Sequence, residues 1–272
     1  MIRVGFIINF RKNNWIGGYN HFVNLFNYIS SYPKKNIEPV LITDNLSRLK
    51  KENSFKKFKS ISTKLVSNNN KFIRIINKIL IIIFGKNFLL EKFLKKNNIS
   101  ILSHSGFTGN KSKIKSFPWF PDFQEINLPN NFSLMASFLR YINLKLAFKN
   151  STNLLISSKS VLDDLRKINK DYVKKSILIK HAIDIPKIPS YITSQKILNK
   201  YKLSNNYFFL PNHLWKHKNH IVVLKALNYL KKKVNIKIVA SGHFNDHRNP
   251  HHSTKIMNYI NSHNLNKNFI HL

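Results

Sequence analysis

The sequence predicts an α/β protein with doubly wound, Rossmann-like domains, and three observations support this class. Short apolar runs rich in branched residues are typical of parallel strands that are buried on both faces. Between these runs, apolar residues recur at helical spacing, and loops with Gly or Pro join the segments. The same alternation restarts near Tyr207, which indicates a second domain built on the same plan.

The first segments form a βαβ unit. Residues 4–9 (VGFIIN) predict a strand, and a loop with Gly17 and Gly18 leads into a helix whose apolar residues recur every three or four positions. Residues 39–43 (PVLIT) predict the next strand. This order is that of a βαβ unit in a parallel sheet.

The rest of the first domain is less regular. Residues 45–70 are basic and polar and predict loop with helix. Residues 116–132 (SFPWFPDFQEINLPNNF) hold three prolines among aromatic residues, which predicts an ordered loop rather than a strand or helix. Further strands are expected at 99–103, 153–157 and 176–180.

The chain divides into residues 1–185, a linker at 186–205 that contains two prolines, and a second domain at 206–272. The second domain is expected to be incomplete, because its order βαβαβ is half of a doubly wound domain. The last strand would then leave a sheet edge uncovered, so we expect the chain to be a fragment or truncated product.

The composition is strongly basic. There are 46 Lys and Arg against 11 Asp and Glu, a formal net charge of +35. One interpretation is a polyanionic partner, and the other is a coding bias toward Lys, Asn and Ile, since the basic residues are spread along the chain. No nucleic-acid-binding motif is present, so a specific nucleic-acid partner is not expected. The absence of cysteine excludes disulfides, thiolate metal sites and a cysteine nucleophile.

One apolar stretch raises the question of a membrane. Residues 79–84 (ILIIIF) lie between Lys78 and Lys86, far short of the roughly 20 apolar residues of a spanning helix. A basic, apolar helix here either lies on an anionic membrane surface or packs in the core. The N-terminus lacks the pattern of a signal peptide.

Four loops carry candidate chemistry, each with a structural alternative. Gly17 and Gly18 would let the backbone approach an anion or would simply permit a turn. Loop 211–219 places His213 and Lys218 between a strand and a helix, either to bind a diphosphate or as a solvated basic turn.

The other two loops are weaker candidates. Asp122 and Gln124, among aromatic residues, would contact sugar hydroxyls or belong to a packed corner. His243 and His247 have a metal-compatible spacing, but their Gly- and Asn-containing loop favours an exposed turn over a metal site.

Taken in order, these segments resemble group 1 (GT4-like) glycosyltransferases of the GT-B fold. The resemblance covers nearly the whole chain. It is carried by WIGGYNHFVNL (15–25), WFPDFQEINLPNNFS (119–133), LISSKSVLDDL (155–165), HAIDIP (181–186), YFFLPNHLWKHKNHIVVLKAL (207–227) and IKIVASG (236–242) with Asp246, Arg248 and Pro250.

The resemblance implies two Rossmann-like domains facing a cleft, with a nucleotide-sugar donor on the second domain and the acceptor on the first. It implies transfer that retains the anomeric configuration, to a glycan or lipid-linked acceptor in cell-surface polysaccharide synthesis. Neither a cofactor nor a metal is expected. The expected location is cytoplasmic, with peripheral contact to the inner face of an anionic membrane.

Residue roles follow from the same resemblance. Gly17 and Gly18 would lie near the donor phosphate and the acceptor, and Lys218 would bind the diphosphate. His213 stands where the family often has an arginine. His104 and Asp122 are the candidate catalytic residues at the first domain's side of the cleft. The family's paired glutamates would fall after residue 272.

Two alternatives stay open. The chain could be a catalytically inactive remnant that binds polyanions or an anionic membrane through its basic surface. It could also be another α/β enzyme, such as an epimerase, although the restart near Tyr207 argues against this class.

Overall fold

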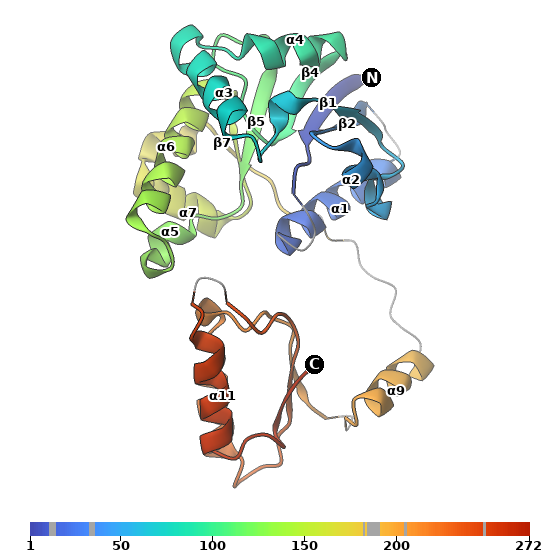
Figure 1. The fold of residues 1–272 in the computed structure, drawn as a ribbon, viewed down its shortest axis with the longest axis vertical. Helices are drawn as coiled ribbons and strands as arrows, with labels where there is room; N and C mark the ends of the chain where they lie inside the picture. Colours follow the sequence, from blue (N-terminus) through green and yellow to red (C-terminus); the bar gives the residue numbers. More distant parts are fainter. Residues whose placement is uncertain (11–14, 33–35, 182, 184–190, 204–205, 247–248) are drawn as a thin grey trace. The chain divides into compact units, whose positions relative to one another are not determined.

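The computed structural model describes residues 1–272 except 11–14, 33–35, 182, 184–190, 204–205 and 247–248, and at 191–193 the backbone only. The chain forms two compact units, Met1–Ile185 and Pro186–Leu272 (Figure 1). Each unit has its own parallel sheet flanked by helices, so the α/β class is confirmed.

The first unit is built on a seven-stranded parallel sheet in the order β3-β2-β1-β4-β5-β6-β7. The strands are β1 (Ile2–Ile7), β2 (Ile37–Thr43), β3 (Lys59–Ser62), β4 (Ile99–His104), β5 (Lys115–Phe120), β6 (Leu154–Ile156) and β7 (Ser176–Leu178). Strand β1 pairs with β2 on one side and β4 on the other. The order therefore reverses at β1/β4, where the connections leave the sheet in opposite directions.

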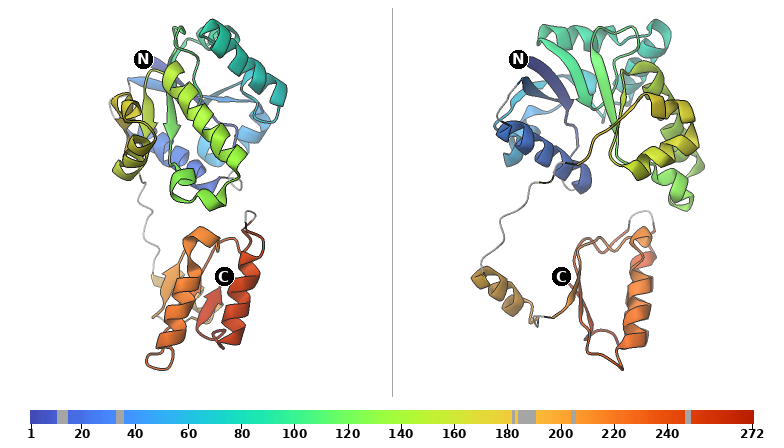
Figure 2. Two further views of the ribbon diagram at one scale, coloured as in Figure 1. Left: turned by 90° about the vertical axis from the view of Figure 1, so that its left-hand side faces the viewer. Right: turned by 180° about the vertical axis from the view of Figure 1, so that it is seen from behind.

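Helices cover both faces of this sheet (Figure 2). They are α1 (Ile16–Ser31), α2 (Leu46–Lys50), α3 (Lys71–Phe84), α4 (Phe88–Lys96), α5 (Gln124–Asn127), α6 (Leu134–Asn150), α7 (Lys159–Ile168) and α8 (Lys170–Lys174), with short 3-10 turns η1 (Asn53–Phe55), η2 (Lys64–Val66) and η3 (Pro129–Asn131). Strand β2 shows why both faces must be covered. Its Leu41 belongs to one buried cluster, whereas Val40 and Ile42 belong to another.

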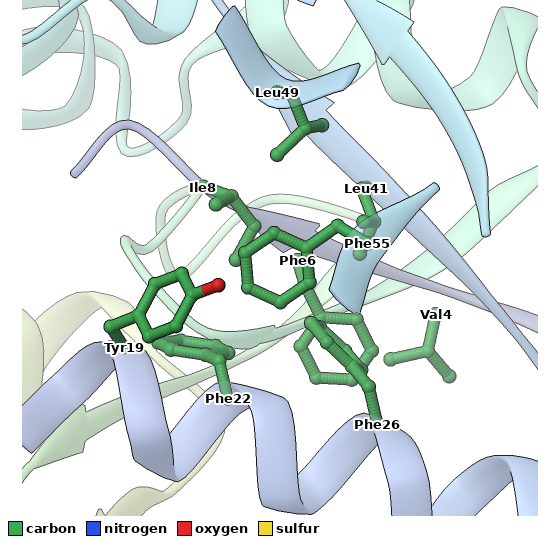
Figure 3. Packing of buried hydrophobic residues seen from close by; sticks show 9 residues of the cluster. All are labelled: Val4, Phe6, Ile8, Tyr19, Phe22, Phe26, Leu41, Leu49 and Phe55. Carbon is green, nitrogen blue, oxygen red and sulfur yellow. The ribbon is translucent and has the colours of Figure 1, made fainter. Parts of the chain in front are cut away.

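The cluster between α1 and the sheet is largely aromatic (Figure 3). Phe6 of β1 and Phe26 of α1 meet edge to face with ring centroids 5.1 Å apart. Phe22 and Phe55 close the same cluster. Because the apolar residues of α1 recur every three or four positions, they share one face of the helix, and this face packs against the sheet.

Two parts of the first unit differ from the sequence-based expectation. Strand β3 was not expected, because its polar residues lack an apolar pattern and it lies at the sheet edge. Strand β5 includes Pro118, within the stretch expected as a loop. Pro118 is the last residue paired with β4, and pairing with β6 begins at Trp119. Proline has no N–H to donate, and Pro118 therefore lies at the point where β5 stops pairing with β4 and begins to pair with β6.

The second unit contains a three-stranded parallel sheet in the order β10-β9-β8. Its strands are β8 (Phe208–Leu210), β9 (Ile238–Ala240) and β10 (Phe269–His271), and its helices are α9 (Tyr191–Lys200), η4 (Lys216–Lys218), α10 (His220–Leu230) and α11 (His252–Ser262). Fully buried Leu214, Leu224 and Ile256 join the sheet to α10 and α11. The stretch 186–205, expected as a linker, contains α9, while residues 186–190 lie outside the described part.

None of the helices among the described residues is long and apolar enough to cross a bilayer. This result agrees with the bracketing lysines around residues 79–84.

The aromatic cluster should dominate the stability of the first unit. We expect Phe26→Ala to lower the free energy of unfolding by about 3–5 kcal/mol, because Phe26 is fully buried and its removal leaves a cavity. Urea unfolding followed by tryptophan fluorescence measures this change. Tyr28→Ala, two residues along the same helix but exposed, is the control and should cost about 1 kcal/mol or less. Equal losses in the two variants would contradict the packing described.

Candidate functional site

A cavity of about 370 Å³ opens at the carboxyl ends of β1 and β4 in the first unit. Ile7 is the last residue of β1 and Asn9 lies two residues beyond it, while His104 ends β4 and residues 105–107 follow. Aromatic Phe10, Trp15 and Phe22 and the polar side chains of α3 complete the wall. Ligands of open parallel sheets bind where the strand order reverses, and this cavity lies at that place.

His104 is the buried titratable residue of this cavity. It ends β4 with a left-handed backbone (φ 63°), which directs its ring away from the regular path of the strand. Its Nδ1 lies 2.8 Å from the hydroxyl of Ser103, and its buried Nε2 has no partner among the described residues. Burial, with a smaller effect from His21, lowers the pKa of His104 to about 3. A neutral imidazole is therefore held at the cavity wall at physiological pH.

A second histidine, which the sequence analysis did not single out, lies beside it. His21 of α1 stacks on Trp119 with ring centroids 4.0 Å apart, and its ring lies 5.3 Å from that of His104. Its Nδ1 is 2.8 Å from Nδ1 of His181. Burial first, then the charge of His181, lowers the pKa of His21 to about 4. The sequence feature that could have identified His21 is its position three residues after Gly18, on the apolar face of the predicted helix.

The two glycines of the first loop have different roles in the structure. Both lie in the first turn of α1, whose N-cap residue Trp15 offers no side-chain cap. A Cβ on Gly18 would stand 2.2 Å from the Trp15 ring, so Gly18 allows the indole to lie flat on the helix. A Cβ on Gly17 would meet nothing within 4 Å. Open backbone with uncapped N–H groups is suited to an anion, as the sequence predicts for Gly17.

Asp122 lies two residues beyond β5 and is not among the described residues that line the His104 cavity. Its carboxylate accepts a hydrogen bond from Gln124 and lies 3.6 Å from the guanidinium of Arg140. Arg140 also binds Glu125 at 2.8 Å. The structure therefore places Asp122 in an ion-pair cluster, separate from His104 in the cavity.

The loop after β8 forms a second site, in the second unit. His213 Nδ1 accepts a hydrogen bond from the backbone N–H of His243 at 2.8 Å, and the two rings stack. This contact ties the loops that follow β8 and β9. Burial, followed by the charges of His243 and Lys218, lowers the pKa of His213. His213 is thus close to Lys218, as expected, but is a weaker cation than an arginine there would be.

Lys218 ends the short turn η4, and Asn219 adopts a left-handed backbone (φ 55°) before α10 begins. The side chain of Lys218 is exposed, and it lies next to the start of α10, a helix whose N-terminus has no side-chain cap. A cation and free helix N–H groups at one strand end are a suitable pair for a diphosphate.

The histidine-rich loop does not form a metal site among the described residues. Asp246 is buried and accepts hydrogen bonds from the Lys216 N–H at 3.0 Å and the Asn249 side chain at 3.2 Å. It therefore fixes the loop. A cavity of about 650 Å³ lies between Lys216, His252 and Lys255 at the starts of α10 and α11. His247 and Arg248 lie outside the described residues.

No protein-family model matches the sequence, and no curated protein matches it. Solved structures do. A glycosyltransferase from Rickettsia africae has a TM-score of 0.63 at 14% identity, covering 100% of this chain and 68% of that one. HepE from Anabaena, solved with UDP and glucose, has a TM-score of 0.66 at 11% identity, covering 100% and 69%.

The same comparison includes UDP-GlcNAc 2-epimerase from Neisseria meningitidis, with a TM-score of 0.56, 12% identity and coverage of 100% and 72%. These likenesses confirm the GT-B-type fold with two Rossmann-like units. Because the likeness to an epimerase extends over the full length of this chain, the restart near Tyr207 does not argue against that class.

The buried histidines should make the first unit sensitive to acid. An unfolded histidine has a pKa near 6.5, whereas folded His21 and His104 stay neutral down to about 4 and 3. Below pH 6.5 the unfolded chain therefore binds more protons. The stability from neutral burial is complete above pH 6.5 and is lost as the pH falls.

We expect the urea concentration at the unfolding midpoint of the native protein to decrease when the pH is lowered from 7 to 5. In His104→Gln the free energy of unfolding should depend less on pH, by at most about 1.4 kcal/mol per pH unit and only well below pH 6.5, because one proton fewer is bound on unfolding. His251→Gln, which removes an exposed histidine, serves as the control and should leave the slope unchanged. A native slope retained in His104→Gln would show that His104 is protonated in the folded protein.

Proposed function

We propose that the protein is a glycosyltransferase that moves a sugar from a nucleotide-diphosphate donor to a glycan or lipid-linked acceptor, with retention of configuration. The observation that carries this proposal is the cavity at the β1/β4 reversal, with a neutral His104 in its wall whose Nε2 has no partner among the described residues. The fold shared with solved glycosyltransferases supports it. HepE, which has been solved with UDP-glucose, supports a nucleotide-sugar as the donor class.

The chemistry assigns a separate task to each unit. In the second unit, Lys218 and the N–H groups at the start of α10 would stabilise the negative charge on the departing diphosphate. In the first unit, His104 Nε2 would hydrogen-bond a hydroxyl of the acceptor glycan, and the N–H groups around Gly17 would donate hydrogen bonds to an anionic group of the ligand.

The transfer balances without a metal or an added base. The bond between the anomeric carbon and the diphosphate oxygen breaks while the acceptor oxygen bonds to the same carbon. The acceptor's proton passes to the departing phosphate oxygen. Neutral His104 fits a hydrogen-bonding role in this scheme, since its lowered pKa leaves it uncharged throughout.

A second candidate function is the epimerisation of a nucleotide-sugar, favoured by the likeness to UDP-GlcNAc 2-epimerase. Incubation with UDP-GlcNAc alone separates the two activities. An epimerase converts the sugar without an acceptor, whereas a transferase releases UDP only slowly unless an acceptor is present. Epimerised UDP-sugar as the product would overturn the transferase proposal.

Donor binding tests the role of Lys218. Titration calorimetry with UDP-glucose should show an affinity for Lys218→Ala that is weaker by roughly tenfold or more, because a charge-assisted hydrogen bond to phosphate is lost. Lys232→Ala removes the same charge from an exposed site two residues beyond α10 and should leave the affinity unchanged.

Replacing His213 by the family's usual residue tests the neighbouring position. His213→Arg supplies a permanent cation, so we expect UDP-glucose affinity to increase at pH 7.5, by roughly fivefold or more. His217→Arg, in the same loop, is the control. Unchanged affinity in both Lys218→Ala and His213→Arg would show that the loop after β8 does not contact the diphosphate.

A further inference from the structure

Helix α3 exposes its apolar face and turns its polar side chains inward, the reverse of an ordinary surface helix. Residues 72, 75, 79, 82 and 83 share one face by their spacing, and all are apolar. This face is exposed: Phe72 is 70%, Ile82 63% and Ile83 65% accessible. The polar residues of the same helix, Arg74, Asn77 and Lys78, face the cavity instead.

Helix α6 extends the exposed apolar surface. Asn143 of α6 and Ile81 of α3 line the same cavity, so the two helices flank it, and both lie along the same side of the unit in Figure 1. The first turns of α6 expose large apolar side chains. They are Leu134 (93%), Met135 (65%), Phe138 (58%) and Leu139 (55%), and Phe88 and Leu89 of α4 are also exposed. Large apolar side chains exposed in this number along helix faces mark a contact with a membrane or protein.

The charges on these helices select an anionic partner. Helices α3 and α6 carry no acidic residue. Their basic residues are Lys71, Arg74, Lys78, Arg140, Lys145 and Lys149. Among the described residues, only Arg140 of these six is in an ion pair. Two copies meeting through this surface would oppose like charges, in a chain of net charge +35.

We propose that the exposed apolar faces of α3 and α6 dock the first unit on an anionic lipid bilayer, with both helices lying in the plane of the interface. At 14 residues, α3 is about 21 Å long, shorter than the roughly 30 Å hydrocarbon core. It therefore lies on the membrane rather than across it. Apolar side chains enter the acyl boundary, and the exposed Lys71, Lys145 and Lys149 contact the headgroups.

Docking in this way would place the cavity next to the lipid surface, because α3 forms both its wall and the docking face. An acceptor whose glycan is attached to a lipid through an anionic linkage could then reach Arg74 and Lys78 from the bilayer. This choice of acceptor rests on the proposed transferase function, whereas the docking itself does not.

The test is flotation of the full chain with phosphatidylcholine vesicles that do or do not contain phosphatidylglycerol. Binding is expected to the anionic vesicles and to be weakened by salt. Ile82→Glu in α3 and Phe138→Glu in α6 should each reduce the partition coefficient by roughly tenfold or more, because an inserted apolar side chain is lost. Tyr28→Glu makes the same charge change at an exposed aromatic of α1 (56% accessible) and should have a far smaller effect.

Three outcomes would overturn the proposal: no binding to anionic vesicles, equal losses in all three variants, or a dimer that Ile82→Glu dissociates. Equal losses would indicate attraction by charge alone. UDP-glucose binding, measured on the native chain, separates this proposal from the enzymatic one. No flotation of the native chain with intact donor binding refutes the docking surface only, and flotation of the native chain without donor binding refutes the transferase only.

Discussion

The parallel pairing of β1 with both β2 and β4 is the constraint on which the rest of the first unit depends. Parallel neighbours require crossover connections, and these leave the sheet on opposite faces at the point where the order reverses. The carboxyl ends of β1 and β4 are therefore left uncovered, and the cavity forms there. His104, at the last position of β4, is exposed to this space by strand order rather than by local sequence.

The polar part of the cavity is held by aromatic packing. Trp119 follows Pro118 in β5 and stacks on His21, while Trp15 lies on Gly18 and packs near Trp119, with ring centroids 5.8 Å apart. These rings remove water from the imidazoles, which keeps them uncharged. The cavity wall thus combines the hydrogen-bonding nitrogens of the imidazoles with flat apolar indole rings. This combination is suited to a sugar, whose hydroxyls form hydrogen bonds while its ring packs on an aromatic face.

Much of this arrangement could be predicted from the sequence. The buried strands and α1 were predicted because their apolar period is strong, and the strand predicted at 99–103 ends immediately before His104, the last residue of β4. The pairing of His21 with His181 could not be predicted, since it joins residues 160 positions apart. The engagement of Asp122 by Arg140 likewise depends on how α6 packs against the segment that follows β5. Local pattern carries no information on such distant contacts.

Helix α3 shows a different limit of sequence analysis. Its sequence predicts an amphipathic helix, but periodicity does not say which face turns inward. The structure decides this, because Leu80 and Ile81 alone of α3 are buried, while the wider apolar face stays outside. The distinction between a core helix and a surface-lying helix therefore needed tertiary structure.

The contact between His21 and His181 has a further consequence. A neutral imidazole carries one N–H, so when both rings are neutral the two Nδ1 atoms, 2.8 Å apart, hold a single hydrogen between them. If it belongs to His21, the buried Nε2 of His21 is a bare lone pair. If it belongs to His181, that Nε2 carries a proton. A concerted exchange of tautomer in both rings, one of them exposed, thus converts a buried nitrogen from acceptor to donor while each ring stays neutral.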